Sequence, residues 1–418
     1  MKPLDIAISG CGPAGLAAAL LLYRQGHSVT LFDQFDTPGP VGSGLMIQPT
    51  GLAVLEQLGL ASETAARGSR IDALKGMEEH GRIALDAHYD KLGLPEAFGI
   101  GIHRASLFEI LFEAVCAHNV PIEVGRLVSG SQSTAEKRWL IFDDGSCSDP
   151  FDLVVDANGW QTPFDKAEAK ILPFGALWAS LPSKAGDPFS DNLLEQRYRR
   201  AAQMVGVLPI GQRSRETGSE VAFFWSMKRD DVPQWQSTPL DDWKEEVMRL
   251  WPETAILLER ITDREQLTFA SYAHRTNRHP VAHRLITIGD AWHSASPQLG
   301  QGANMALLDA WSLARALESA RAVYDALSMA VSWRKDHVDL YQWITAFFTP
   351  LYQSEGAVQP WVRDRILAPL SQIWPVSLIQ SSLMSGLFGW PLAPLGLSPP
   401  DYSAIASRTA AIASSESQ

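Results

Sequence analysis

The sequence predicts an α/β fold, in which a parallel sheet with helices is interrupted by an inserted, mostly antiparallel sheet and followed by a helical C-terminal part. Near the N-terminus, a helix-forming stretch lies between two short β-rich runs. From about residue 171 to 272, apolar runs alternate with charged turns. A buried strand and a long helix return near residue 284. Strand–helix–strand units favour a parallel sheet, whereas short strands separated by turns favour an antiparallel one.

Composition narrows the class of protein. The chain has 418 residues, which exceeds one ordinary core and favours two domains or one large two-part unit. The net charge of −12 argues against a nucleic-acid binder, because such proteins usually carry a basic patch. Cys11, Cys116 and Cys147 are too few and too scattered for a disulfide framework or a metal site. With no signal-peptide pattern at the N-terminus, we expect a cytoplasmic protein.

The first elements form a βαβ unit. Residues 4–9 form a short apolar strand, residues 13–25 are rich in Ala and Leu and predict a helix, and Gly26 is a plausible helix stop. Residues 28–33 predict the second strand. A helix between two short strands implies that the strands are parallel neighbours.

A G-x-G-x-x-G loop joins the first strand to this helix. Gly10 permits the tight turn, Gly12 lets the backbone approach a pyrophosphate, and Gly15 lets helix and strand pack closely. The helix begins at Pro13, and the N–H groups of its first turn, from Ala14 onward, are free to bind phosphates. Asp33 stands where an acid takes ribose hydroxyls. We therefore predict a dinucleotide site; the alternative is a glycine turn that serves packing only. The loop does not distinguish NAD from FAD.

The remaining elements predict the division of the chain. Residues 105–119 predict a helix, residues 151–156 a strand, and residues 267–273 the last strand of the insertion. Residues 285–288 predict a buried strand, followed by a helix over about 302–319. We expect a nucleotide-binding domain over 1–170, an inserted sheet over 171–283, the return of the first domain over 284–345, and a helical, apolar cover over 346–418.

Residues 289–304 suggest the second half of the site. Asp290 follows the buried strand, and the Gly300-Gln301-Gly302 turn opens the long helix. Asp290 suits the hydroxyls of a polyol chain, and amide groups at a helix N-terminus stabilise negative charge. A reduced flavin carries negative charge on its pyrimidine side, which matches these donors. The alternative is an ordinary glycine-capped turn.

This stretch resembles the GD motif of the class A flavoprotein monooxygenases, the para-hydroxybenzoate hydroxylase-like family, although Trp292 replaces an alanine. The positions that match are Gly289, Asp290, Ala291, His293, Pro297, Gly300, Gln301, Gly302, Asn304 and Asp309. The run Gly42-Ser43-Gly44-Leu45 resembles the flavin loop of the family, and Arg104-Ala105-Ser106-Leu107 its R-x-x-L helix start. The resemblance covers roughly Leu4 to Leu317.

The resemblance implies a Rossmann-like FAD-binding domain with an inserted substrate-domain sheet. It implies hydroxylation of an aromatic or polycyclic small molecule with O2 through a flavin hydroperoxide, with NAD(P)H as the usual electron donor. Arg104 would lie by the ribityl or phosphate region, Asp290 would hold the ribityl chain, and Pro297 would lie beside the reacting carbon of the flavin. Gly44 and Leu45 would line the ring through their backbone. Further candidate cofactor contacts are Val128, Gly300, Gln301, Gly302, Ala303 and Asn304.

The chain departs from the family in a middle motif that bridges flavin and nicotinamide binding. Asn158 replaces Asp, Thr162 replaces Ser, and Asp165 replaces an arginine. The arginine that often precedes the flavin loop is also absent, since Gly39-Pro40-Val41 stands there. An acid near a phosphate repels it. We therefore expect weak direct use of NAD(P)H, with reduced flavin from outside or a partner reductase as the electron source, unless Lys166 or Arg275 serves the phosphates.

The sequence signal for the substrate pocket is less specific than the signal for the cofactor site. The inserted sheet offers aromatic candidates for a mostly apolar pocket: Trp178, Phe224, Trp225 and Tyr272. His274 is a candidate acid, base or orienting group, although a surface histidine is the simpler interpretation. Two other functions stay open: a flavin-dependent reductase or dehydrogenase that inserts no oxygen, and a non-enzymatic FAD-binding partner protein.

The C-terminal region has an unusual composition. From Ile366 to Pro400 there is no charged residue, and Pro375, Pro391 and Pro394 interrupt the apolar runs. We expect a cover packed on the catalytic unit. The alternatives are a peripheral membrane contact or an entrance for a lipophilic substrate.

Overall fold

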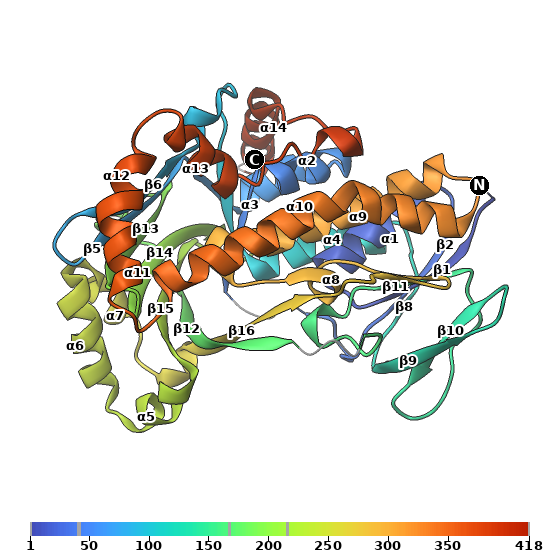
Figure 1. Ribbon diagram of the computed structural model, residues 1–418, viewed down its shortest axis with the longest axis horizontal. Coiled ribbons are helices and arrows are strands. Elements are labelled where there is room, and N and C mark those ends of the chain that lie inside the picture. The colour runs from blue at the N-terminus through green and yellow to red at the C-terminus, as the bar shows by residue number, and fades with distance from the viewer. Residues whose placement is uncertain (1, 40–42, 166–168, 215–216, 417–418) are drawn as a thin grey trace.

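The computed structural model describes residues 2–39, 43–165, 169–214 and 217–416, and Figure 1 shows their arrangement. Pro40, Val41, Gly42 and Lys166, which entered the sequence predictions, lie outside the described residues. The fold is α/β with several sheets and a helical C-terminal region, as the sequence predicts.

A six-stranded sheet forms the first domain, in the order β17-β18-β11-β1-β2-β8. Its strands are β1 (Asp5–Ser9), β2 (Ser28–Phe32), β8 (Ile122–Glu123), β11 (Leu153–Asp156), β17 (Val281–Ala282) and β18 (Leu285–Thr287). All neighbouring pairs are parallel except β17 with β18. Helix α1 (Pro13–Arg24) connects β1 to β2, and helices α4 (Arg104–Ala117) and α9 (Gly302–Ser319) pack against it. The returning strand β18 therefore joins the same sheet as the N-terminal βαβ unit.

A seven-stranded sheet forms the second layer, in the order β16-β12-β15-β14-β13-β5-β6. Its strands are β5 (Ala73–Glu78), β6 (Ile83–His88), β12 (Lys170–Pro182), β13 (Leu193–Arg199), β14 (Gln203–Gln212), β15 (Ser219–Lys228) and β16 (Thr268–Thr276). The pairing is antiparallel, as predicted, except that β13 and β5 run parallel. The sheet is not confined to residues 171–283, because β5 and β6 precede that range. The pairing of β5 with β13 joins segments more than a hundred residues apart, which no local pattern reveals.

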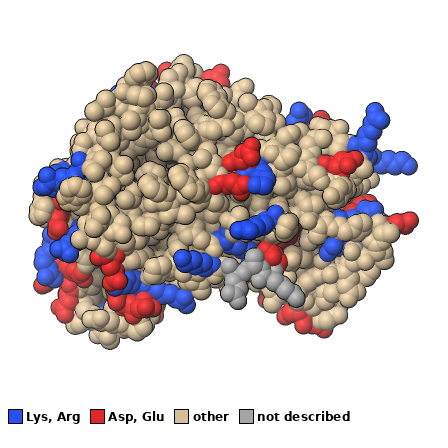
Figure 2. Space-filling model, in the orientation of Figure 1, with Lys and Arg blue, Asp and Glu red and all other residues tan. Residues whose placement is uncertain are grey.

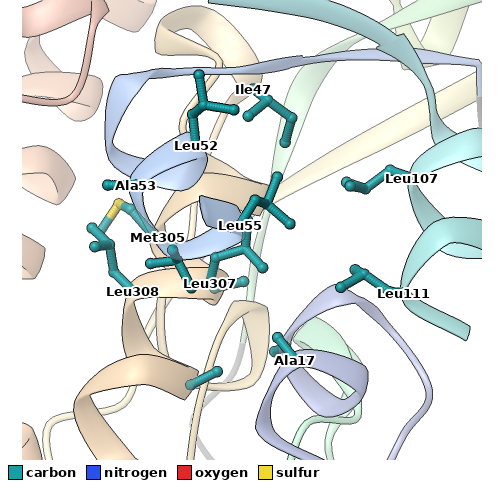
Figure 3. Packing of buried hydrophobic residues seen from close by; sticks show 14 of the residues in the cluster. Ala17, Ile47, Leu52, Ala53, Leu55, Leu107, Leu111, Met305, Leu307 and Leu308 are labelled. Carbon is teal, nitrogen blue, oxygen red and sulfur yellow. The ribbon is translucent and has the colours of Figure 1, made fainter. Parts of the chain in front are cut away.

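Smaller elements link the two sheets. β3 (Gly44–Ile47), β4 (Ser69–Ile71) and β7 (Gly99–His103) form a three-stranded sheet, and α2 (Pro49–Gln57) and α3 (Ala61–Arg67) follow β3. Helices α5 (Val232–Ser237), α6 (Leu240–Leu250) and α7 (Ala255–Leu258) lie between β15 and β16. Figure 3 shows part of the hydrophobic core: Ala17, Leu107 and Leu111 lie around Leu55, Ala53 lies beside Met305 and Leu308, and Leu52 lies next to Ile47.

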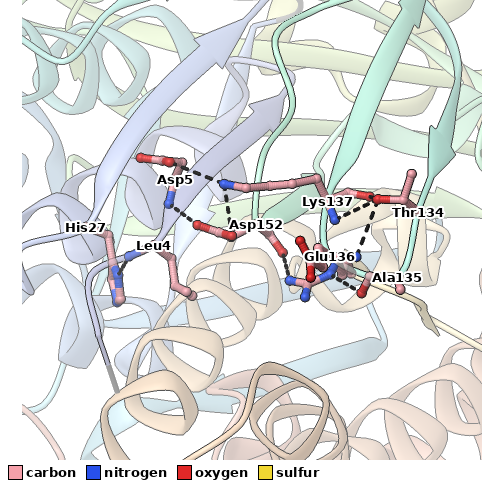
Figure 4. Close-up of polar contacts among 9 residues, drawn as sticks. Leu4, Asp5, His27, Thr134, Ala135, Glu136, Lys137 and Asp152 are labelled. Carbon is pink, nitrogen blue, oxygen red and sulfur yellow. Dashed lines mark hydrogen bonds and ion pairs between the residues drawn. The ribbon is translucent and has the colours of Figure 1, made fainter.

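A hairpin of β9 (Val128–Ser133) and β10 (Arg138–Phe142) lies beside the first sheet. Figure 4 shows how it is held: the Lys137 ammonium lies 3.0 Å from the Asp152 carboxylate and 3.4 Å from that of Asp5, and Asp152 also accepts a 3.0 Å bond from the Asp5 amide. Close by, the Leu4 amide donates to His27. These contacts join the hairpin to the edge where β1 begins.

The C-terminal part is helical. It contains α10 (Val323–Tyr352), α11 (Val358–Val362), the π-helical turn η7 (Arg363–Leu367), α12 (Ala368–Ser371), α13 (Val376–Met384) and α14 (Tyr402–Glu416). The expected boundary at residues 345 and 346 falls inside α10, so this helix belongs to both parts. Among the described residues, we find no helix with both the length and the hydropathy needed to cross a bilayer.

Candidate active site

The glycine loop has the geometry of a phosphate site. Gly10 has φ +105°, and a Cβ there would lie 2.4 Å from the Ala157 carbonyl oxygen. A Cβ on Gly15 would lie 1.9 Å from the Gly10 oxygen, whereas a Cβ on Gly12 would meet nothing within 4 Å. Gly10 and Gly15 are thus required by packing, and the space beside Gly12 is open. Helix α1 begins there with Pro13, and neither a side-chain cap nor an acid in its first turn competes for the amides.

Asp33 is fixed beside this loop. One carboxylate oxygen accepts a 2.9 Å bond from the Cys11 amide, and the other accepts a 3.0 Å bond from the Phe35 amide. Each oxygen retains a lone pair for a further donor. The arrangement holds the carboxylate at the carboxyl end of β2, where the resemblance implies a ribose contact. Val128 lies in the same region, with its side chain buried against Phe32 and Phe142.

The second motif converges on the first. Gly289, with φ +62°, would place a Cβ 3.1 Å from Ala14 of α1 and 3.4 Å from Ala306 of α9. The Asp290 carboxylate oxygen lies 3.8 Å from the position of a Cβ on Gly302, at the start of α9. Residues separated by almost three hundred positions therefore meet between the N-termini of two helices.

Asp290 is accessible to solvent, although protein atoms crowd around it. Burial raises the pKa of its carboxyl, and the positive charges of His293 and Arg104 oppose that rise. Arg104, the first residue of α4, is exposed, and its charge also acts on the Tyr272 hydroxyl. The Arg104 charge thus acts both on the acid of the second motif and on an aromatic residue of the larger sheet.

Hydrogen bonds to buried protein groups fix the turn before α9. Gly300 has φ +61°, which favours glycine, and Ala303 is half-buried in the first turn of α9. The fully buried Asn304 side chain donates to the Met46 and Gly300 carbonyls and accepts from the Gln48 amide, so it fixes β3 against α9. Its contribution to a cofactor is therefore indirect.

The Gln301 side chain also points into the protein, which is contrary to the expectation that it contacts a cofactor directly. Its amide group donates to the Met384 carbonyl at 2.8 Å, and its side-chain oxygen lies beside Gly386. The backbone groups of Gln301 and Gly302 remain at the N-terminus of α9, which has no side-chain cap. Sequence reasoning missed this contact with the C-terminal segment because the motif shows no signal for it.

Two of the predicted aromatic residues share one face of the larger sheet with Trp178. The Trp178 indole donates a 2.8 Å hydrogen bond to the Tyr272 hydroxyl and packs on Phe224, with ring centroids 4.7 Å apart. Burial raises the pKa of Tyr272 to about 12, against the effects of Trp178 and Arg104. The phenol therefore stays protonated at neutral pH.

The position of Trp225 corrects the prediction that it lines the substrate pocket. It is buried on the opposite face, where it packs in a core with Trp243 of α6 and Leu177 of β12. Side chains alternate along a strand, so Phe224 and Trp225 cannot line the same pocket. Trp225 serves the core.

Pro297 and His274 occupy different surroundings. Pro297 is exposed at the start of the turn that leads to Gly300, whose amide donates to its carbonyl. His274 is half-buried on β16 opposite Lys170, and burial, with the Lys170 charge, lowers its pKa. A neutral imidazole beside a lysine is unsuited to act as a general acid at neutral pH.

A chain of hydrogen bonds that the sequence did not predict lies next to the flavin loop. The Ser43 and Ser180 hydroxyls are 2.7 Å apart, and Ser180 lies 3.2 Å from His103 Nε2. His103 Nδ1 accepts from the Ala105 amide. Burial, together with the Arg213 charge, lowers the pKa of His103 to about 4, so the ring is neutral and its Nε2 carries the proton toward Ser180. The chain fixes the loop against β12.

The residues of the middle motif that differ from the family pattern contact other residues of this chain. The buried Asp156 accepts from the side chains of Asn158, at 2.8 Å, and Thr162, at 2.6 Å. The Asp165 carboxylate lies 3.1 Å from the buried Arg275 guanidinium, which also donates to the Trp160 carbonyl. Asp165 and Arg275 therefore neutralise each other.

These residues fit FAD. The open space beside Gly12, the uncapped helix N-termini at Pro13 and Gly302, and the acids at Asp33 and Asp290 give two anion sites and two hydroxyl acceptors along one path. A pyrophosphate, a ribose and a polyol require this set.

Replacing Asp290 with Ala is expected to remove one or two charge-assisted hydrogen bonds to FAD, each of about 1.5–3 kcal/mol, and so to weaken binding by about 10- to 150-fold for each bond lost. Titration of the apoprotein with FAD, followed by flavin fluorescence, measures this. Asp241→Ala changes an exposed acid on α6 and is the matched control. Equal affinity in both variants would remove Asp290 from the site.

Comparison with known proteins agrees with the geometry. The model of the FAD binding domain family matches residues 3–146 and 151–330. The chain is 27% identical over 328 residues to 3-amino-4-hydroxybenzoate 2-monooxygenase of Streptomyces cremeus, covering 76% of this chain and 79% of that protein. It is 26% identical over 333 residues to 3-hydroxybenzoate 6-hydroxylase of Klebsiella oxytoca, covering 76% and 80%.

Solved structures show the same fold. The tetrameric form of 2-methyl-3-hydroxypyridine-5-carboxylic acid oxygenase has a TM-score of 0.75 at 18% identity, over 94% of this chain and 98% of that chain. Klebsiella pneumoniae HpxO complexed with FAD and uric acid has a TM-score of 0.74 at 17% identity, over 92% and 98%. From its matched family model, its motifs and its fold, this chain belongs to the FAD-binding-domain family of class A FAD-dependent aromatic monooxygenases.

Proposed function

We propose that this enzyme hydroxylates a small aromatic or polycyclic molecule with O2, and that the substrate lies between the cofactor and the Trp178 face of the larger sheet. One observation carries the proposal: the hydroxyl of Ser43 in the flavin loop lies 2.7 Å from that of Ser180, which stands on the same face of β12 as Trp178, so the cofactor motif and the aromatic face meet. The hydroxybenzoates in the names of two relatives are small aromatic substrates of this kind.

Bound FAD would supply the activation of O2, and the protein residues would bind and orient. The amides at the starts of α1 and α9 and the acids Asp33 and Asp290 would hold the cofactor. The half-buried Trp178 ring, packed on the buried Phe224, offers an apolar surface, which suits an aromatic ring. The Tyr272 hydroxyl accepts from Trp178, and its own proton remains for a substrate oxygen.

We also propose the division of the chain into an FAD-binding domain, an inserted substrate sheet and a C-terminal cover. The matched family model runs through both sheets to residue 330, which supports treating them as one catalytic unit. A cytoplasmic location is proposed as well, on the three free cysteines.

Replacing Tyr272 with Phe is expected to raise the KM for the aromatic substrate by about 2- to 12-fold, because one hydrogen bond of about 0.5–1.5 kcal/mol is lost. FAD affinity should stay unchanged, since the ring remains. Steady-state O2 consumption with a panel of hydroxylated aromatic acids measures KM, and Tyr324→Phe, an exposed tyrosine on α10, is the control. An unchanged KM would place the substrate elsewhere.

The reaction class has a separate test. With isotopically labelled O2, the mass of the product must rise by one labelled oxygen atom. Substrate-dependent loss of NAD(P)H or reduced flavin without an oxygenated product would favour a reductase or dehydrogenase instead.

A further inference from the structure

We propose that the outer face of the C-terminal region docks on the surface of a lipid bilayer. We define this apolar face by exposed residues on α10, α11, η7, α12 and α13 and in the segments that follow α12 and α13. They are Trp343, Phe347, Trp361, Ile366, Leu370, Ile373, Trp374, Val376, Ile379 and Trp390. Trp374 is 77% exposed and Trp390 is 83% exposed, which is unusual for tryptophan in water.

The elements of this face are neighbours. α10 contacts α11, η7 contacts both α11 and α12, and α12 contacts α13. A Cβ on Gly389 would lie 3.0 Å from Leu340, which places Trp390 beside α10, and Trp343 stacks on Phe347. Figure 2 shows few charged side chains over α11 to α13 and the adjoining half of α10. The exposed residues therefore belong to one region, larger than the scattered apolar residues of an ordinary surface.

Part of this region inverts the usual amphipathic pattern, although Met384 of α13 is buried as usual. In α13, Ser381 and the following Ser385 are buried, while Val376 and Ile379 are exposed. In α12, Ser371 is buried and Leu370 is exposed. A helix facing water shows the opposite pattern, with its apolar side on the core. The outer side of these helices is thus built for an apolar environment.

Lipid fits this face better than a protein partner does. Interfaces between proteins keep a polar rim and about ten hydrogen bonds, whereas residues 366–400 contain no charged side chain. Tryptophan prefers the boundary of a bilayer, because its ring is apolar and its indole N–H reaches water. Short helices interrupted by Pro375 suit a surface that lies in the boundary.

The face is joined to the cofactor motif. Gln301 donates to the Met384 carbonyl, the Tyr341 hydroxyl donates to the Leu383 carbonyl, and His337 lies 3.2 Å from the Gly386 carbonyl. Docking would therefore occur on the segment that packs directly on the turn before α9. This proposal concerns a surface away from the aromatic site and stands independently of the proposed function.

Flotation of the FAD-loaded enzyme with phosphatidylcholine vesicles tests the proposal. We expect the enzyme to float with the vesicles and to stay bound in 0.5 M NaCl, on the order of three times physiological ionic strength, because the residues that define the face are apolar and salt does not screen their contact with lipid. The double variant Trp374→Asp and Trp390→Asp should lower the vesicle partition coefficient by at least about tenfold. Tyr324→Asp changes an exposed aromatic near the other end of α10 and should leave it unchanged.

Monomer mass, flavin absorbance and oxygen consumption of the double variant show that it is folded. Brominated lipids should quench tryptophan fluorescence in the wild type and quench it less in the variant. The proposal is overturned if the enzyme does not float, if the variant floats equally well, or if light scattering without lipid shows a dimer that the variant abolishes, since a second copy would then cover the face.

Discussion

Replacing Arg334 with Met is expected to destabilise the protein by about 3–5 kcal/mol, the usual cost of removing one partner from a buried ion pair. The side chains of Arg334 and Asp309 are both 1% exposed, and the guanidinium donates to the carboxylate at 2.8 Å. Without Arg334, Asp309 keeps His293 at 2.6 Å and the Gly289 amide at 2.9 Å, but it remains an undercompensated buried charge. Urea unfolding followed by circular dichroism measures the loss.

Lys335→Met is the matched control, because Lys335 is the next residue on α10 and pairs with Asp339 at the surface. Surface pairs contribute about 0–1 kcal/mol, so the control should change little. Similar unfolding midpoints for the two variants would show that the Asp309–Arg334 pair does not hold α9 to α10. Loss of FAD should accompany the Arg334 change, since Asp309 fixes the backbone of the second motif through Gly289.

The same pair predicts a pH dependence. Burial acts to raise the pKa of Asp309, but the charges of His293 and Arg334 and the hydrogen bonds they make lower it to about 2. A depressed carboxyl pKa stabilises the folded state above the unfolded value, about 3.9, and the contribution is lost as pH falls toward 2. In the Arg334→Met variant, the pKa of Asp309 should rise toward its unfolded value. The folded state of this variant should therefore lose less stability as pH falls over the same interval.

Reduction of the flavin by NADH or NADPH is expected to be slow, and added reduced FAD or FMN, or a partner reductase, is expected to restore turnover. Asp165 stands where the family resemblance expects an arginine for phosphates, and Arg275 is occupied by Asp165 at 3.1 Å and by the Trp160 carbonyl. The pair therefore offers neither the bidentate clamp nor the net positive charge that a nucleotide phosphate needs.

Anaerobic stopped-flow mixing with the aromatic substrate present measures this step, because members of the family often gate reduction on substrate binding. Bleaching of the flavin band within seconds at sub-millimolar NAD(P)H would refute the expectation. The Asp165→Asn variant leaves the Arg275 charge less neutralised and should speed reduction by NADPH. The control variant Asp143→Asn changes an acid next to β10 and should not speed it.

The sequence alone determined those parts of the protein that depend on local backbone geometry. The turn at Gly10, the close packing at Gly15 and the turn at Gly300 follow from contiguous residues, because a missing Cβ or a positive φ restricts the residue at that position. The βαβ unit and the antiparallel strands of the insertion followed from periodicity, which is also local. The α/β fold and FAD binding could therefore be predicted before any coordinates.

Tertiary structure alone decided what depends on pairing between distant segments. β5 joins β13 through a register that no local pattern encodes, and the choice of face places Phe224 toward Trp178 and Trp225 in the core. Arg275 meets Asp165 only because β16 passes the middle motif. Composition marked residues 366–400 as uncharged, but only packing determines that Ser381 of α13 is buried while Val376 and Ile379 are exposed. Such contacts are set by the summed burial of the whole chain, so they emerge only in the folded molecule.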